Sequence, residues 1–322
     1  MSAPDTLASV GESAALQRIF PRLPHASATL LGPGDDAAVI AAPDGRFVVT
    51  TDMMIHGPDF RLAWSSPFDL GWKAAASNLS DVAAMGAVPS ALVVALALPE
   101  HTPISVLEGI ADGLREACEA LAPGCGVVGG DMSVSPTMTF AVTAFGDLEG
   151  RAPVTRSGAR AGDVIAVSGE LGAAAAGLRV LFTEAVNADG APDAALAAAV
   201  GDRTLAQRRP SPPIADGKLA SLAGATAMLD LSDGLAKDAA RIASASDVAI
   251  DFDSAALGPD VALALGGGED HSLLASFPAG ATLPGGFRAV GAVRAGSGVL
   301  LDGAPLTAAG WDPYRGWDGL AG

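Results

Sequence analysis

The run Lys73-Ala-Ala-Ala-Ser-Asn-Leu-Ser-Asp81-Val-Ala-Ala-Met-Gly86 is the stretch around which the chain is organised. Its small residues, with apolar ones at helical spacing, predict a helix over 69–86 that ends at Gly86. Asp81 is then an acid on a mostly apolar helix, and it shares a face with Asn78. Because burying an unpaired carboxylate is costly, Asp81 points to solvent, caps another group or holds a cation.

The composition indicates a globular, strongly acidic protein. The chain has 322 residues, of which 50% are hydrophobic, and this is enough for packed cores and typical of two domains. The net charge is −17 with only three lysines, so we expect no nucleic-acid partner and no anionic membrane partner. The acids must therefore face solvent or metal ions.

Two further features favour a cytoplasmic protein. Cys118 and Cys125 are the only cysteines, which indicates neither a disulfide framework nor a zinc site. The first residues carry no basic segment followed by an apolar stretch, and no run approaches the ~20 apolar residues that span a bilayer. We therefore expect reduced thiols and cytoplasmic localisation.

Helical and strand patterns alternate, which predicts an α/β fold of the α+β type. We expect helices over 13–20, 69–86, 104–121, 170–181, 214–222 and 235–245. We expect strands over 47–52, 91–98, 127–131, 137–145, 164–167, 248–252, 273–277, 287–293 and 299–301, and a strand-to-loop transition over 228–234. Residues 185–206 have weak helical periodicity. A polar, glycine-containing segment from Arg151 predicts the boundary between two domains, 1–149 and 150–322.

Six aspartates lie where apolar runs give way to glycine, threonine or serine: Asp36, Asp52, Asp81, Asp131, Asp230 and Asp233. The strand over 47–52 is expected to deliver Thr50, Thr51 and Asp52 together at its end. Such hard oxygen ligands favour Mg²⁺, which keeps several waters and bridges to substrate phosphates. Each aspartate taken singly could also be a turn or helix-cap residue.

Two near matches to nucleotide motifs do not fit their required context. Gly124-Cys-Gly-Val-Val-Gly129 has dinucleotide-fingerprint spacing, but it follows a predicted helix and leads into a strand, whereas the fingerprint follows a strand and opens a helix. Gly217-Lys218 lacks the upstream glycine of a phosphate-binding loop. If ATP binds, the backbone amides of Gly129 and Gly130 can still receive a phosphate.

Several blocks, in order along nearly the whole chain, resemble the thiamine-monophosphate kinase family. The most specific are Asn78-Leu-Ser-Asp81-Val-Ala-Ala-Met-Gly86 and Leu229-Asp-Leu-Ser-Asp-Gly-Leu235. The others are Gly34-Asp-Asp36, Thr50-Thr-Asp52, Gly129-Gly-Asp131, Thr155-Arg156-Ser-Gly, Arg209-Pro-Ser-Pro212, Gly267-Gly-Glu-Asp270 and Gly310-Trp-Asp312.

The resemblance implies transfer of the γ-phosphoryl group of ATP to thiamine monophosphate with several Mg²⁺ ions. It implies an aminoimidazole ribonucleotide synthetase-like fold, and a homodimer whose N-terminal halves pair into a β-barrel. The implied metal ligands are Asp36, Thr50, Thr51, Asp52, Asp81, Asp131, Asp230 and Asp233, of which Asp81, Asp131 and Asp233 are expected to act in catalysis. The implied nucleotide contacts are Gly130, Asp131, Arg156 and Ser232, and the implied substrate contacts are Glu269 and Trp311.

The departures from the family pattern lie near the expected acceptor. Asp59 stands where the family has a histidine near the substrate, and we take it as a substrate contact. His271-Ser272 and Pro313-Tyr314 replace the family's Tyr-Glu and His-Phe. His56 and His271 are otherwise interpreted as ordinary polar positions.

Other interpretations remain open at this point. A sibling of the same superfamily, of the selenophosphate or ribonucleotide-amidine type, would keep the ATP and metal residues but act on another acceptor. A non-catalytic acidic cation binder would have no reason to carry Gly129-Gly-Asp131 and Arg156. Arg156 is alternatively a solvated linker residue, and Trp311 a core residue.

Overall fold

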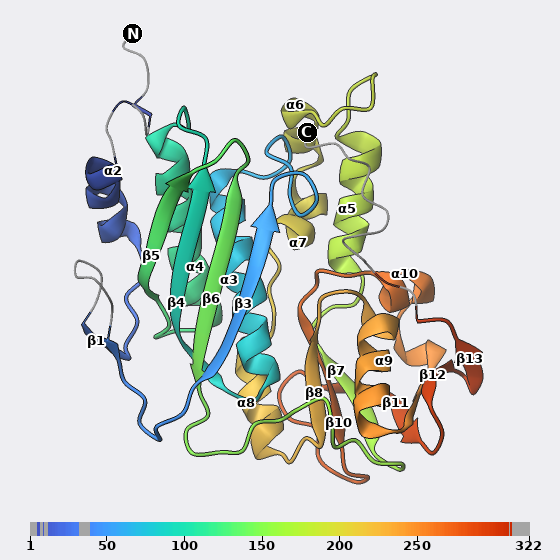
Figure 1. The fold of residues 1–322 in the computed structure, drawn as a ribbon. Helices are drawn as coiled ribbons and strands as arrows, with labels where there is room; N and C mark the ends of the chain where they lie inside the picture. Colours follow the sequence, from blue (N-terminus) through green and yellow to red (C-terminus); the bar gives the residue numbers. More distant parts are fainter. Residues whose placement is uncertain (1–4, 7–8, 10–11, 32–38, 309, 311–322) are drawn as a thin grey trace.

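The computed structural model describes the chain except for residues 1–4, 7–8, 10–11, 32–38, 309 and 311–322. Two sheets lie side by side, with helix α3 (Pro67–Ala84) between them (Figure 1). The smaller sheet takes its strands from the first half of the chain and the larger from the second half. The predicted mixed α/β architecture is therefore confirmed, while the domain boundary at 149/150 stays a prediction.

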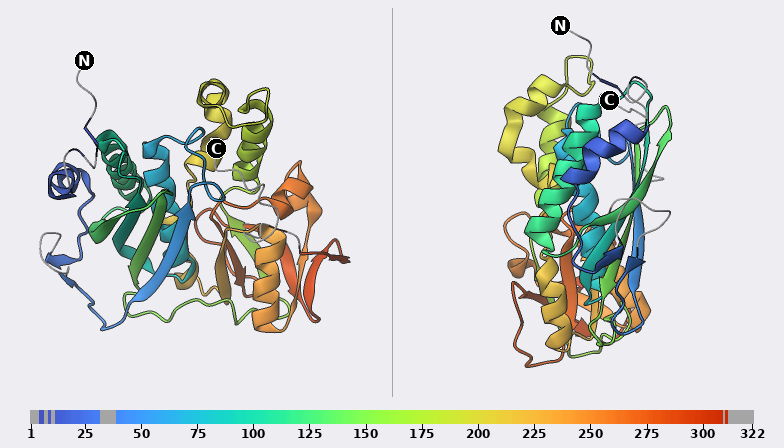
Figure 2. Two further views of the ribbon diagram at one scale, coloured as in Figure 1. Left: turned by 45° about the horizontal axis from the view of Figure 1, so that its top comes forward. Right: turned by 90° about the vertical axis from the view of Figure 1, so that its left-hand side faces the viewer.

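The smaller sheet has four strands in the order β3-β6-β4-β5, and only β4 and β5 run parallel. Its strands are β3 (Val48–Ile55), β4 (Val88–Leu98), β5 (Val127–Val134) and β6 (Thr139–Asp147). Helices α3 and α4 (Ile104–Leu121) cover one face, where Phe140 and Val142 are buried. Among the described residues no helix packs on the other, uncovered face, where Val49 and Met53 are 60% and 59% exposed, although Ile40 packs there with Val93 and Phe145 (Figure 2).

Helix α3 begins with a capping box and packs unusually close to α4. The Ser66 side chain accepts from the Asp69 amide, and the Asp69 carboxylate accepts from the Ser66 amide, which satisfies two free N–H groups. A methyl group on Gly71 would lie 2.1 Å from the Ile110 carbonyl oxygen. The absence of side chains at such positions lets the two helix backbones approach each other.

The larger sheet has seven strands in the order β13-β12-β9-β11-β7-β10-β8. They are β7 (Val164–Ser168), β8 (Ala227–Leu231), β9 (Ala249–Phe252), β10 (Ser272–Phe277), β11 (Arg288–Arg294), β12 (Gly298–Leu301) and β13 (Ala304–Leu306). Helices α8 (Ile214–Leu222), α9 (Leu235–Ser246) and α10 (Val261–Gly266) and the turn η3 (Ser254–Ala256) accompany it. Helix α3 contacts α8, β8 and β10, so it belongs to both halves of the molecule.

Residues 173–208 form a helical arm that lies beside the larger sheet and contacts the loop that follows β3. It consists of α5 (Ala173–Glu184), α6 (Ala194–Val200), η2 (Gly201–Thr204) and α7 (Leu205–Arg208). Trp64 of that loop is buried against the arm and donates to the Ala185 carbonyl oxygen at 2.9 Å. Within residues 185–206, whose helical periodicity is weak, the chain thus forms short helices.

Near the N-terminus the structure has α2 (Glu12–Ile19), η1 (Phe20–Arg22), and the strand pair β1 (Thr29–Leu31) and β2 (Val39–Ile40). None of the described helices is both long and apolar enough to cross a membrane.

Two predicted strand ends were wrong. Strand β3 continues to Ile55 and β5 to Val134, so Asp52 and Asp131 lie within strands and not at their ends. Because side chains alternate along a strand, Thr51 also points to the opposite face from Thr50 and Asp52.

Candidate active site

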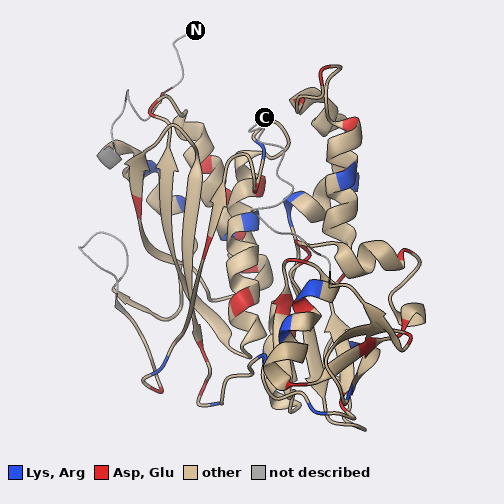
Figure 3. Ribbon diagram, turned by 45° about the vertical axis from the view of Figure 1, so that its right-hand side comes forward, with Lys and Arg blue, Asp and Glu red and all other residues tan. Residues whose placement is uncertain are grey.

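Three aspartates from three elements form an acid cluster between the two sheets. Asp52 comes from β3, Asp81 from α3 and Asp230 from β8. Thr50 Oγ1 donates to Asp81 Oδ2 at 3.0 Å, which ties β3 to α3. Asp81 therefore faces the other acids of the cluster, and Figure 3 shows acidic positions on α3 and on the adjoining end of the larger sheet.

Asp230 is buried beside two polar groups. Ser80 Oγ lies 3.1 Å from Asp230 Oδ2, and His271 Nδ1 lies 3.3 Å from the same oxygen. Ser80 and Asp230 thus approach one ring nitrogen of a buried histidine, which is not the relay geometry of a serine nucleophile. His271, which the sequence suggests is an ordinary polar position, is thus buried in contact with an acid of the cluster.

The electrostatics of the cluster favour bound cations. Burial, followed by repulsion from Asp230 and Asp52, raises the pKa of Asp81 to about 7. Burial also raises the pKa of Asp52, with a contribution from Asp230. Burial opposes the charges of Asp230 and His271, but their mutual hydrogen bond lowers the pKa of Asp230 and raises that of His271. Only one of the three acids therefore has a close cationic partner within the cluster.

This donor set fits Mg²⁺ as a partial site. Among the described residues no group of three or more histidine, cysteine, aspartate or glutamate side chains is arranged to bind a metal ion by itself. Mg²⁺ does not require one, because it keeps several waters and completes its shell with substrate phosphates. Repelling, desolvated carboxylates with a neighbouring threonine hydroxyl are the hard ligands it prefers.

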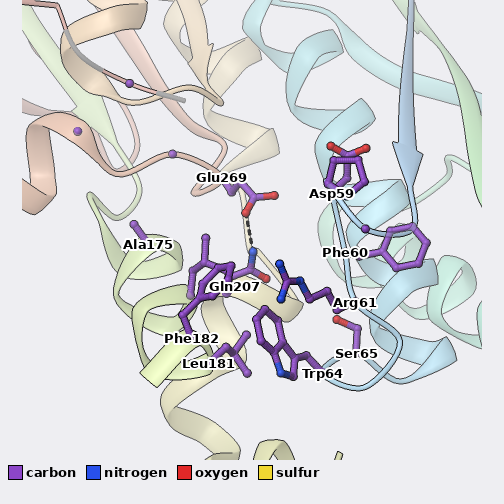
Figure 4. A pocket seen from close by; sticks show the side chains of 16 residues that line it. Asp59, Phe60, Arg61, Trp64, Ser65, Ala175, Leu181, Phe182, Gln207 and Glu269 are labelled. Atoms are coloured by element: carbon purple, nitrogen blue, oxygen red, sulfur yellow. Dashed lines mark hydrogen bonds between the residues drawn. The ribbon is translucent and has the colours of Figure 1, made fainter. Parts of the chain in front are cut away.

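A pocket of about 490 Å³ opens beside the cluster. One wall is the loop after β3, another is α5, and a third carries Gln207 and Glu269 (Figure 4). The Arg61 guanidinium lies 4.7 Å from the Trp64 ring centroid and 4.8 Å from that of Phe182, which gives the pocket a stacked aromatic end. Its volume and mostly apolar lining suit a flat organic molecule with few polar groups.

A strained loop connects the pocket with the acid cluster. Glu269 and His271 both have left-handed backbones, with φ of 67° and 53°. Between them, the Asp270 carboxylate accepts from the Gly172 and Ala174 amides at 2.6 and 2.7 Å. Glu269 of this loop thus lines the pocket, whereas His271, two residues later, contacts Asp230 of the acid cluster. Such strain in non-glycine residues concentrates at functional sites.

The structure brings many of the predicted site residues to this region. Asp59 and Glu269 both line the pocket, and the Asp59 carboxylate accepts from the Ile55 amide at 2.7 Å. Ser232 follows β8 directly, and its carbonyl oxygen accepts from the Glu269 amide at 2.9 Å. The exposed Arg156 is near enough to Asp230 to lower its pKa, although less than His271 does.

Other predicted residues lie apart or have different partners. Asp233 pairs with Lys237 and Arg241. Asp131 pairs in register with Ala95 and lies, like Thr51, on the uncovered face of the smaller sheet. Gly130 approaches β4 so closely that a methyl group would lie 2.0 Å from the Val94 carbonyl oxygen. Asp36 and Trp311 lie outside the described residues.

Sequence reasoning missed Lys73, Ser80, Arg61, Trp64 and Gln207. Lys73 and Ser80 lie inside the quoted helix, where a buried lysine among alanines was the available signal. Nothing local in the sequence indicates the stacking around Arg61, because its two rings come from segments far apart in the chain.

Known proteins resemble both the sequence and the fold. A family model described as "AIR synthase related protein, N-terminal domain" matches residues 34–148. A thiamine-monophosphate kinase of Mycobacterium tuberculosis is 43% identical over 330 residues, covering 97% of this chain and 92% of the relative.

Two solved structures resemble the model closely. The thiamine-monophosphate kinase from Stenotrophomonas maltophilia has a TM-score of 0.75 and 33% identity, and the match covers 91% of this chain and 97% of that one. A structure described as "AaThiL complexed with AMPPCP and TMP" has a TM-score of 0.73 and 34% identity, with coverage of 86% and 90%.

Proposed function

This chain belongs to the thiamine-monophosphate kinase family, and from that premise we propose how its acid cluster and pocket divide the work of the reaction. It phosphorylates thiamine monophosphate with ATP, giving thiamine diphosphate and ADP. The observation that carries this conclusion is 43% identity to a thiamine-monophosphate kinase over 97% of this chain and 92% of the relative.

The pocket is the site we assign to the thiamine moiety of the acceptor. Thiamine carries a flat aminopyrimidine and a cationic thiazolium, which suit aromatic faces and carboxylate partners. Phe60, Trp64 and Phe182 supply aromatic surface, and Asp59 and Glu269 supply carboxylates. The acceptor phosphate would then extend along the 269–271 loop towards Asp230.

The acid cluster is the site we assign to Mg²⁺. Asp52, Asp81 and Asp230 with Thr50 would hold it. The family resemblance implies Asp36, Thr51, Asp131 and Asp233 as ligands of further Mg²⁺ ions, since Thr51 and Asp131 lie on the opposite sheet face from Asp52. Bound Mg²⁺ would supply positive charge where the triphosphate of ATP and the phosphate of the acceptor, which repel each other, must meet. The cluster and its acidic substrates are compatible only with such cations.

The residues of the chain contribute chiefly by positioning. The acceptor is a phosphate oxygen that is already ionised at neutral pH, so the transfer needs no strong general base. The pocket holds the ring end of the acceptor while the cluster holds the metal end, which favours in-line geometry. We assign nucleotide contacts to Gly130, Asp131, Arg156 and Ser232.

We further propose a homodimer formed through the uncovered face of the smaller sheet. Val49 and Met53 are 60% and 59% exposed on this face, and apolar exposure of this kind is typical of an interface. Asp131 and Thr51 lie on the same face, so a second copy would enclose them. A two-fold pairing of identical sheet faces is the simplest closed arrangement.

Cytoplasmic localisation is also our proposal. The described cysteines Cys118 and Cys125 are free and buried, and a hydrogen bond between them, followed by burial, raises the pKa of Cys125. Neighbouring thiols that remain unlinked suit a reducing compartment.

Measuring ADP release with a panel of acceptors tests the proposed function. We expect release with thiamine monophosphate and none with thiamine, inorganic selenium donors or ribonucleotide amidines. Faster release with another acceptor would instead assign the chain to a sibling activity on the same fold.

A further inference from the structure

Three polar side chains from separate elements meet at one wall of the pocket. Lys73 Nζ of α3 lies 2.6 Å from Glu269 Oε1. Gln207 Nε2 of α7 donates to Glu269 Oε2 at 2.5 Å, and Lys73 Nζ lies 3.5 Å from Gln207 Oε1. Both carboxylate oxygens of Glu269 therefore have a fixed partner, as Figure 4 shows for Gln207.

This arrangement is costly for the fold. The Lys73 side chain is 6% exposed and is followed along the helix by three alanines, and a buried ammonium loses most of its hydration. Glu269 adds a left-handed backbone with φ of 67°. Replacing a buried ion pair by an apolar pair of similar volume is often neutral or stabilising, so stability alone does not explain why Lys73 is placed here.

The position of each group decides its role. Glu269 and Gln207 line the pocket, whereas Lys73 is not among the lining residues and lies behind Glu269. Asp59 on the loop after β3 is near enough for both Glu269 and Lys73 to influence its pKa, after the larger effects of burial and the Ile55 amide. Lys73 therefore acts on a bound molecule through the carboxylate that it holds.

We propose that Lys73 is a positioning residue for the acceptor, which together with Gln207 fixes the Glu269 carboxylate towards the cationic or N–H-donating rings of thiamine. This inference rests on the proposed function of the pocket. A carboxylate held in one direction recognises a cation at less entropic cost than a mobile one. The rings, and not the phosphate, are the part of the acceptor that Lys73 serves.

Thiamine has the rings but no phosphate, so comparing its binding with that of thiamine monophosphate distinguishes a role of Lys73 at the rings from a role at the phosphate. We expect Lys73→Met to raise the Kd of both molecules by a similar factor, about tenfold, in titration calorimetry. The Kd of a non-hydrolysable ATP analogue with Mg²⁺ should stay unchanged. Lys218→Met is the matched control, because Lys218 pairs with the exposed Glu149 away from the pocket, and it should alter none of the three constants.

Two further variants keep the test decisive if Lys73→Met folds poorly. Gln207→Met removes the hydrogen bond from Gln207 to Glu269 and leaves no charge without its partner. It should raise both Kd values by about threefold. Combining Lys73→Met with Glu269→Gln should be no worse than Glu269→Gln alone, because both changes remove the same interaction.

Several results would overturn the inference. A loss confined to thiamine monophosphate would place Lys73 on the phosphate, unchanged Kd values would make the pair purely structural, and an equal loss for the ATP analogue would indicate general damage. A wild-type protein that forms no thiamine diphosphate would contradict the proposed function instead. The two failures are therefore distinguishable.

Discussion

At the scale of single residues, Asp81 is the group whose charge matters most to the acid cluster. It combines burial with repulsion from two neighbouring carboxylates, and its pKa is raised to about 7 as a result. A bound cation would relieve that repulsion. The hydrogen bond that Thr50 donates to the Asp81 carboxylate offsets it only in part.

Asp81→Asn should reduce turnover by more than about a hundredfold, because an amide of nearly the same shape is a far poorer ligand for Mg²⁺. Removing one of the repelling charges should leave the melting temperature equal or higher. Steady-state kinetics at saturating Mg²⁺ and a thermal melt measure the two effects. Near-normal activity would remove Asp81 from the site.

Asp69 provides a pH-dependent contribution to stability. Burial alone would raise the pKa of this fully buried carboxylate, but hydrogen bonds from Arg209 and Ser66 and the charge of Arg208 lower it below 3.8. A lowered folded-state pKa means that the contribution is present above the unfolded pKa and is lost as pH falls through the folded value.

Asp69→Asn should therefore lower the free energy of unfolding by about 3 kcal/mol above about pH 5. Denaturant titrations of both proteins should show the difference narrowing as the pH falls from the unfolded-state pKa towards the lowered folded-state pKa, where the wild-type carboxylate becomes protonated. A difference that does not change with pH would mean that the ion pairs contribute nothing.

At the scale of elements, the contact between α3 and α4 depends on the absence of side chains. A methyl group added at Gly71 or at Gly113 would lie 2.1 Å from a backbone oxygen of the other helix. The two helices can approach closely only because of these residues, and their separation sets where α3 carries Asp81.

Gly71→Ala should destabilise the protein by about 1–3 kcal/mol, although alanine normally favours a helix over glycine by about 1 kcal/mol. The sign is reversed because the added methyl group would displace the Ile110 backbone. A chemical denaturation curve gives the value. Increased stability would show that helix propensity outweighs the contact.

The sequence predicted the bounds of an element best where its buried apolar residues recur at one regular spacing. The extents of α4 and α8 agree with the predicted 104–121 and 214–222, and in α4 the apolar positions recur at helical spacing. Strand β3 was cut short at Asp52, since Thr51 and Met53 look towards the uncovered face, where polar and apolar residues are both tolerated. Helix α5 begins at Ala173 and not at 170, because Gly172 adopts a left-handed backbone before it.

At the scale of the whole molecule, the candidate site depends on contacts that no local pattern contains. The motifs identified Asp59 and Glu269, and both line one pocket. Lys73 could not be linked to Glu269 from the sequence, because they meet only when α3 packs against the larger sheet. Asp131 was expected to join Asp52, but register places it on the other face of the smaller sheet.

The uncovered sheet face predicts the assembly state. We expect light scattering to give twice the monomer mass of 31.7 kDa, because the exposed apolar side chains need a partner. Met53→Asp should shift the mass towards the monomer without preventing folding, since a buried unpaired charge would oppose association. A monomeric wild-type protein at micromolar concentration would contradict the proposed interface.

Transfer of a phosphoryl group from ATP to thiamine monophosphate is the central claim, and ³¹P NMR of the reaction tests it most directly. With ATP, thiamine monophosphate and Mg²⁺, the account predicts one thiamine diphosphate for each ADP and no accumulation of free phosphate. A chelator should stop both products together, because the acid cluster then has no cation. ADP appearing with free phosphate in place of thiamine diphosphate would contradict the account.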